Sequence, residues 1–215
     1  MDLAAVISAF TTLFIVIDPP GLAPVYIALT QGMPAAQRHR IGLRACITAG
    51  VLMLAFLFLG EAVLGFIGIT MPAFRIAGGV LLFLTALDML FQRRQQRRQE
   101  NAADGAAEHQ DDPSVFPLAI PLIVGPGAIT TIILLAGHAR TATDFAAVAL
   151  VMAANLAVVM LTFLAAPFVE RVLGKTGINI VTRVLGMLLA ALAVQFILDG
   201  LRSFGLAGQV LYPPA

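Results

Sequence analysis

The most constraining feature of this sequence is a series of six apolar stretches, each about as long as a bilayer-spanning helix. They cover residues 3–29, 41–60, 72–91, 115–136, 145–168 and 178–199. A transmembrane helix needs about 20 mostly apolar residues, and only helices or closed barrels satisfy their backbone in lipid. The chain is 60% hydrophobic and 12% charged, whereas soluble domains are about 45–50% apolar and about 25% charged. We therefore predict an all-α polytopic membrane protein with six transmembrane helices.

Two of these stretches contain a Pro-Gly interruption. Residues 18–21 read Asp-Pro-Pro-Gly in the first stretch, and residues 124–127 read Val-Gly-Pro-Gly in the fourth. Proline lacks a backbone N–H and clashes with the preceding turn, so we predict that both helices are broken. Backbone groups freed at membrane depth persist only inside protein or beside a wet cavity. Paired interruptions of this kind indicate the substrate site of a transporter.

The two halves of the chain carry matched residues. The pairs are Gly21 with Gly127, Glu61 with Glu170, and Arg75 with Arg183, at offsets of 106, 109 and 108 positions. Each half has three predicted spans, which is an odd number, so the second half enters the membrane upside down relative to the first. This pattern predicts two inverted three-helix repeats, an arrangement seen in many secondary transporters.

The repeats set the predicted domain boundaries. They are residues 1–92 for the first repeat, 93–113 for a linker, 114–205 for the second, inverted repeat and 206–215 for a C-terminal tail. The linker is basic up to Arg98 and acidic and rich in alanine and glutamine from Glu100 to Asp112. It has no apolar periodicity, so we predict that it is disordered.

Basic residues alternate between the loops. Arginine or lysine occupies positions 38, 40 and 44, then 93, 94, 97 and 98, then 171 and 175, in the loops after spans one, three and five. The loop at 61–71 has none, and the loop at 137–144 has only Arg140. Basic loops stay on the cytoplasmic side. We therefore expect a multi-pass protein of the bacterial inner membrane with a cytoplasmic linker and both termini periplasmic. No basic residue precedes the first stretch, which favours a retained span over a cleaved signal peptide.

Asp18 is the first candidate for a functional residue. A charge at mid-membrane depth costs about 2.5–3.5 kcal/mol and marks a functional site by default. An alternative interpretation makes Asp18 an N-cap, with Pro19 at the first helical position. The two interpretations are compatible, since a capping carboxylate keeps lone pairs free.

The second break has no comparable cap, because Val124 stands in place of an aspartate. The N–H groups of Gly127, Ala128 and Ile129 are then expected to open the following helix uncapped. A free helix N-terminus attracts anions, although water or carbonyl groups of another helix are alternative partners. The substrate-binding residues that we predict from both breaks are Asp18, Pro20, Gly21, Gly125, Pro126, Gly127, Ala128, Thr130 and Thr131.

Arg75 and Arg183 occupy matched positions near the start of the last span of each half. They are candidates for gating or for binding a substrate carboxylate, and the alternative is that they snorkel to the membrane surface. Composition argues against other classes of function. The chain has no metal-ligand cluster or nucleotide-binding loop, its three histidines lie in loops or at span ends, and its net charge is +1. We expect no enzyme activity, no metal, no cofactor and no nucleic-acid partner.

Four segments resemble motifs of the MarC family of six-span bacterial inner-membrane proteins. They are Asp18–Pro24, Ala73–Gly79, Phe116–Ala128 and Arg183–Gly186. The resemblance covers nearly the whole chain except the linker and the last ten residues. Some members are described as transporters of small neutral amino acids, so the resemblance implies this substrate class. Pro20 is a departure, since the family often has isoleucine or a similar apolar residue there.

The broken repeats predict a secondary transporter that works by alternating access, and the resemblance implies that it moves small zwitterions such as glycine or alanine. The free helix start at Gly127 would bind the carboxylate, and Asp18 would bind the ammonium group. A proton or Na⁺ could couple transport, and the expected partners are a small-molecule substrate and the lipid bilayer. A homo-oligomer is compatible with the sequence. The alternatives are an efflux-type or other small-metabolite exporter, and a membrane scaffold without transport activity.

Overall fold

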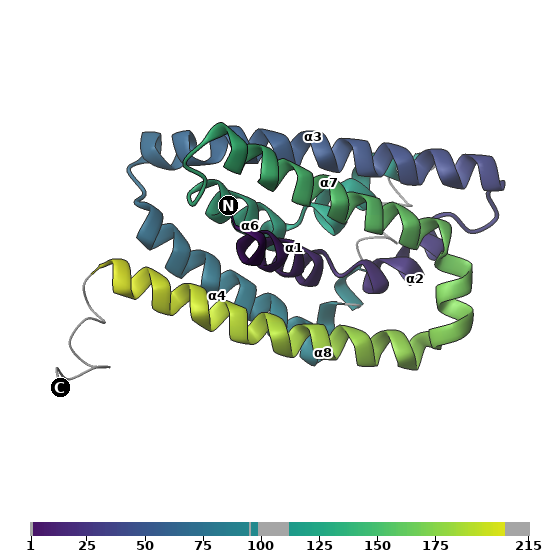
Figure 1. The fold of residues 1–215 in the computed structure, drawn as a ribbon. Helices are drawn as coiled ribbons and strands as arrows, with labels where there is room; N and C mark the ends of the chain where they lie inside the picture. Colours follow the sequence, from purple (N-terminus) through teal and green to yellow (C-terminus); the bar gives the residue numbers. More distant parts are fainter. Residues whose placement is uncertain (1, 95, 99–111, 205–215) are drawn as a thin grey trace.

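The computed structural model describes residues 2–94, 96–98 and 112–204. Within these residues every regular element is a helix (Figure 1), so the all-α prediction is confirmed for the described part of the chain. The elements are α1 (Leu3–Ile17), α2 (Pro19–Leu29), α3 (Ala35–Ile67), α4 (Met71–Leu90), η1 (Ser114–Ile123), α6 (Pro126–Ala136), α7 (Ala142–Leu164) and α8 (Ala166–Ser203).

Five helical segments are long and apolar enough to cross a membrane. They are Leu3–Leu29, Ala35–Ile67, Met71–Leu90, Ala142–Leu164 and Thr176–Ser203. The bent pair of η1 and α6 makes a sixth if it counts as one span, with 62° between the two helices. Each of the six predicted stretches therefore overlaps a candidate span, and the chain is a multi-pass membrane protein.

Two helices are longer than the predicted spans. α3 begins at Ala35 and ends at Ile67, where Gly68 follows with φ +85°. Glycine adopts this left-handed conformation without steric cost, which is why it commonly ends helices. α8 runs from Ala166 and changes direction at Gly174, whose φ is +59°. The predicted stretches cover only the middle of each helix, since α3 extends beyond residues 41–60 at both ends and α8 extends beyond residues 178–199 at both ends.

The helices form two layers around a central broken pair. α3 and α7 pack together on one side, α4 and α8 lie antiparallel on the other, and α1 and α2 lie between them (Figure 1). Gly79 faces α8, where an added Cβ would lie 2.6 Å from Ile197 Cγ1 and 2.8 Å from the Ala193 carbonyl oxygen. Small residues allow such close backbone contact between membrane helices.

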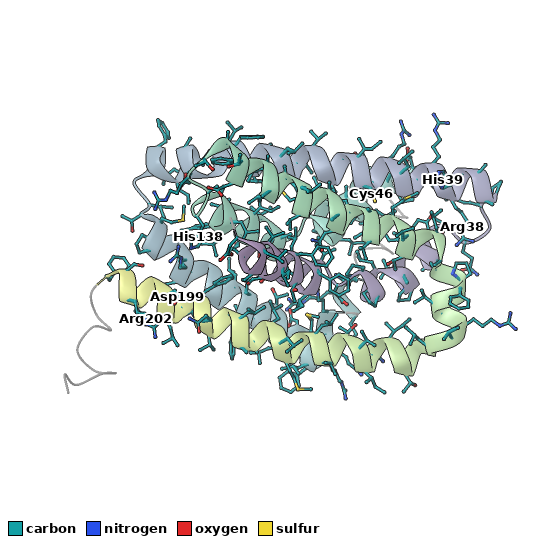
Figure 2. All side chains as sticks on the ribbon, viewed as in Figure 1. Arg38, His39, Cys46, His138, Asp199 and Arg202 are labelled. Atoms are coloured by element: carbon teal, nitrogen blue, oxygen red, sulfur yellow. The ribbon has the colours of Figure 1, made fainter. Side chains whose placement is uncertain are left out.

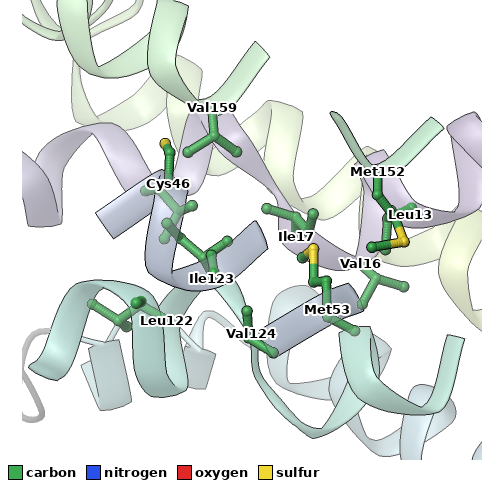
Figure 3. Close-up of a cluster of buried hydrophobic side chains, with 14 of the residues drawn as sticks. Leu13, Val16, Ile17, Cys46, Met53, Leu122, Ile123, Val124, Met152 and Val159 are labelled. Carbon is green, nitrogen blue, oxygen red and sulfur yellow. The ribbon is translucent and has the colours of Figure 1, made fainter. Parts of the chain in front are cut away.

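The interior is a continuous apolar cluster to which all eight helical elements of the described residues contribute buried side chains. Figure 3 shows Leu13, Val16 and Ile17 of α1 beside Cys46 and Met53 of α3, residues 122–124 and Met152 and Val159 of α7. Lipid is as apolar as these side chains, so dispersion contacts from close packing hold them together rather than exclusion of water.

The outer face of α3 is apolar as well. Its exposed residues recur every three or four positions, at Leu43, Ile47, Val51, Leu54 and Phe58. This spacing places them on one face of the helix. A long exposed apolar stripe would favour aggregation in water but matches the chemistry of lipid tails, so this face is expected to contact the bilayer.

Candidate functional site

Asp18 joins the two helices of the first broken span. Its φ is +57°, its N–H donates to the Phe14 carbonyl oxygen at 2.9 Å, and its Oδ1 accepts from the Gly21 N–H at 3.2 Å. Aspartate tolerates the left-handed conformation better than most residues. Asp18 therefore ends α1 and caps α2, which agrees with the capping interpretation of the sequence.

Arg98 is the main partner of the Asp18 carboxylate. Its Nη1 lies 3.1 Å from Asp18 Oδ2, and its Nη2 donates to the Ile17 carbonyl oxygen at 2.8 Å. Arg94 donates to the Val16 carbonyl oxygen, and the Thr182 hydroxyl donates to Asp18 Oδ1 at 3.4 Å. Helix ends leave unsatisfied carbonyl groups, and these arginines supply the donors that the end of α1 lacks.

These contacts change the prediction for the start of the linker. Arg93, Arg94 and residues 96–98 are helical, and Arg98 is only 4% exposed. The predicted disorder is therefore wrong for these residues. Composition shows that these residues are charged. It does not show that buried oxygen atoms of Val16, Ile17 and Asp18 accept hydrogen bonds from the arginines and hold the segment in place. Residues 95 and 99–111 lie outside the described residues, so disorder there stays a prediction.

The second break lies between η1 and α6. Its N-cap residue, Gly125, has no side chain to cap the helix. The Gly127 and Ala128 N–H groups have no acceptor within the described ranges, whereas the Ile129 N–H donates to the Gly125 carbonyl oxygen at 3.1 Å. The prediction of three free N–H groups is therefore wrong for Ile129, because the first helical turn already includes its N–H.

η1 is irregular because of its prolines. Phe116 and Ile120 have extended backbone angles, and each precedes a proline. The proline ring disfavours the helical conformation in the preceding residue. This irregular segment leads into the second break and sets the direction from which the chain enters α6.

A cavity of about 320 Å³ lies at the free start of α6. Its wall combines residues of α1, α4, the end of η1, the first turn of α6 and the helical basic segment that follows α4 (Arg93, Arg94 and residues 96–98, called the basic segment below). The lining residues are Val16, Leu81, Leu84, Thr85, Asp88, Arg94, Arg97, Arg98, Pro121, Leu122, Ile123, Gly125, Pro126, Gly127 and Ala128.

The cavity presents both signs of charge. Arg94, Arg97 and Arg98 are among its lining residues, and the positive end of the α6 dipole lies at the same wall. Among the described lining residues Asp88 is the only carboxylate, and its Oδ2 lies 2.6 Å from Arg97 Nη1. The described part of the chain holds no group of three or more His, Cys, Asp or Glu side chains arranged to hold a metal ion.

The structure brings only part of the predicted site together. Gly125, Pro126, Gly127 and Ala128 line the cavity. The other predicted residues, Asp18, Pro20, Gly21, Thr130 and Thr131, are not among the lining residues. Asp18 is fully buried against Arg98, so its carboxylate faces a guanidinium instead of a ligand. The Thr131 hydroxyl donates to the Gly127 carbonyl oxygen at 2.8 Å within α6.

Arg75 and Arg183 lie away from the cavity. The Arg75 Nη2 is 2.9 Å from His138 Nε2. His138 lies at the same end of the bundle as Asp199 and Arg202, opposite Arg38 and His39 (Figure 2). Arg183 is exposed on α8, and the structure shows no hydrogen bond or ion pair for its side chain among the described residues. The proposed gating roles of both arginines stay predictions.

The sequence analysis did not place Asp88 or the arginines of the basic segment in the site: Asp88 was a lesser polar candidate expected to pair with Arg93 or Arg94, whereas it pairs with Arg97. Arg94, Arg97 and Arg98 follow a spacing of three and four, which places them on one face of a helix. That spacing is a usable signal, because an evenly solvated charged tail has no reason to concentrate its arginines on one face.

The all-helical bundle of the described residues, with five to six apolar segments long enough to cross a membrane, defines a polytopic helical membrane protein. The model of the MarC family integral membrane proteins matches residues 3–204 of this chain. The chain therefore belongs to the MarC family, and the family resemblance of the four motifs is confirmed.

The curated relatives cover almost the full chain. A UPF0056 membrane protein of Methanocaldococcus jannaschii is 39% identical over 202 residues, which are 94% of this chain and 98% of that protein. The membrane protein YvbG of Bacillus subtilis is 36% identical over 208 residues, covering 94% and 96%. The membrane protein YhcE of Escherichia coli is 32% identical over 199 residues, covering 90% of each. No solved structure matches the chain.

Proposed function

We propose that this protein is a secondary transporter of small neutral amino acids in the bacterial inner membrane. The observation that carries the proposal is the cavity at the uncapped start of α6, inside a bundle of apolar helices. The free Gly127 and Ala128 N–H groups and the nearby arginines suit a carboxylate. A volume of about 320 Å³ accommodates a small solute.

The repeat pattern supports alternating access by two inverted three-helix units. α2 and α6 each have 11 residues, each begins with a proline, and each follows a break in an apolar span. Their N-caps are Asp18 and Gly125, so the structural match is shifted by one residue from the Pro20–Pro126 match in sequence. In transporters of this type one repeat moves against the other around a site at the broken helices.

Alanine counterflow in proteoliposomes tests the proposal. Proteoliposomes that contain the purified protein and are loaded with unlabelled alanine are expected to accumulate external radiolabelled alanine transiently, because exchange through one site runs in both directions. Protein-free vesicles are the control. Absence of exchange for alanine, glycine and serine with folded protein would overturn the proposed function.

A second candidate follows from the excess of arginine in the cavity. Arg94, Arg97 and Arg98 are among the lining residues, Arg97 is paired with Asp88, and Arg98 is paired with the buried Asp18. One positive charge, that of Arg94, is left without a carboxylate partner in the described structure, which favours a small organic anion over a neutral zwitterion. Lactate and propionate counterflow in the same vesicles separates the two candidates. Exchange of these anions without exchange of alanine would make the protein an exporter or importer of carboxylates.

The proposed orientation has both termini in the periplasm and the basic segment in the cytoplasm. It can be checked with single cysteines at the exposed positions Gln37 and Arg140 in a Cys46→Ala background. An impermeant thiol reagent is expected to label Arg140→Cys in intact cells and Gln37→Cys only after permeabilisation, because the two positions lie in loops of opposite predicted sides. The reverse pattern would invert the assignment, and equal labelling would contradict it.

A further inference from the structure

Asp88 occupies a position that helix stability does not explain. It lies in the last turn of α4, which ends at Leu90. The carbonyl end of a helix carries negative partial charge, so a carboxylate there is electrostatically unfavourable. Asp88 also lines the cavity, with a side chain that is 20% exposed. Asp88 is thus a carboxylate at the negative end of a helix dipole and in the wall of a cavity, which points to a role in binding a ligand there.

The three cavity arginines differ in how firmly they are held. Arg98 is buried and bonded to Asp18 and the Ile17 carbonyl oxygen, and Arg94 is bonded to the Val16 carbonyl oxygen. The Arg97 side chain is 67% exposed, and its one hydrogen bond in the described structure goes to Asp88. Solvated ion pairs contribute little stability, so they open easily. Arg97 and Asp88 are therefore free to change partners, whereas Arg94 and Arg98 are structural.

We propose that the Asp88–Arg97 pair recognises the two charged groups of an α-amino acid by exchanging partners with it. The substrate carboxylate binds Arg97 together with the free N–H groups of Gly127 and Ala128, and the substrate ammonium binds Asp88. Both ends of the pair stay neutralised after the exchange, so neither charge is left unpaired in the cavity. This inference rests on the proposed function, and it assigns to Asp88 the ammonium contact that the sequence analysis gave to Asp18.

The pair predicts a specific pattern of ligand preference. Wild-type protein is expected to bind alanine at least about tenfold more tightly than propionate, which has the carboxylate but no ammonium. Asp88→Asn should lose that preference, because it weakens alanine and spares propionate. Arg97→Gln should weaken both ligands. Asp88→Glu keeps the charge and should retain the preference for alanine.

Isothermal titration of purified protein with alanine and with propionate measures these affinities. Arg93→Gln is the matched control, since Arg93 is exposed and is not among the cavity-lining residues. Thermal unfolding of each variant confirms that it is folded. Wild-type protein that binds no amino acid would overturn the proposed function and this inference together. Wild-type protein that binds alanine, with an unchanged alanine-to-propionate ratio in Asp88→Asn, would overturn the inference alone.

Discussion

Replacing Arg98 with glutamine is expected to lower the free energy of unfolding by about 3–5 kcal/mol, because removing one partner of a buried ion pair leaves the other charge uncompensated. Asp18 is fully buried, and Arg98 supplies its only ion pair among the described residues. The substitution also removes the donor to the Ile17 carbonyl oxygen. Chemical unfolding of the purified protein in detergent, followed by circular dichroism, measures the loss.

Asp18→Asn is expected to lower the free energy of unfolding to a similar extent, because it removes the charge of the other partner in the Asp18–Arg98 ion pair. Asparagine caps helices about as well as aspartate, so the bond from the Gly21 N–H can remain, but the buried Arg98 guanidinium loses its counter-charge. The double variant Asp18→Asn/Arg98→Gln removes both charges and should recover much of the stability. A double-mutant cycle isolates this coupling. Arg93→Gln is the control, and losses that simply add in the double variant would contradict the buried pair.

The second large effect is expected for Gly127→Val, which should reduce alanine counterflow at least about tenfold. A Cβ at this position would lie 3.0 Å from Val16 Cγ1 and 3.3 Å from Leu82 Cδ2. The two γ carbons of valine then crowd a cavity wall that carries one of the two free N–H groups. Overpacking of this kind costs about 1–3 kcal/mol, so the variant should still fold.

Gly65→Val is the matched control for this substitution. Gly65 is exposed on α3, and no heavy atom lies within 4 Å of an added Cβ there. Transport is normalised to the amount of protein in the vesicles, so that poor insertion is not read as poor transport. Wild-type rates in Gly127→Val would show that the substrate does not pass the start of α6.

The helical class and the approximate positions of the spans could be predicted because they depend on local properties. Apolar stretches of span length must be helical in lipid whatever they pack against. The capping geometry of Asp18 was also predictable, since a cap uses donors only three residues away. The uncapped start of α6 was predicted because Val124 stands in place of an aspartate; the N-cap residue in the structure is Gly125, which has no capping side chain either.

The composition of the site could be predicted only in part. The four residues Gly125–Ala128 were found from the break itself, and they line the cavity. Asp88 and Arg97 were not assigned to the site, because α4 and the basic segment reach α6 only through the packing of the bundle. Asp18 was placed in the substrate site because a buried carboxylate looks the same in sequence whether its partner is a ligand or a distant arginine.

The sequence by itself therefore determined a membrane-embedded all-helical chain, the interruption residues and the caps available to them, because these depend on neighbours within one helical turn. Only the tertiary structure decided which charges pair. Arg98 lies 80 positions from Asp18 in the chain, and Thr182 lies 164 positions from it. A buried acceptor takes whichever donor the packed helices bring within hydrogen-bond distance, and that choice depends on how the bundle closes around it.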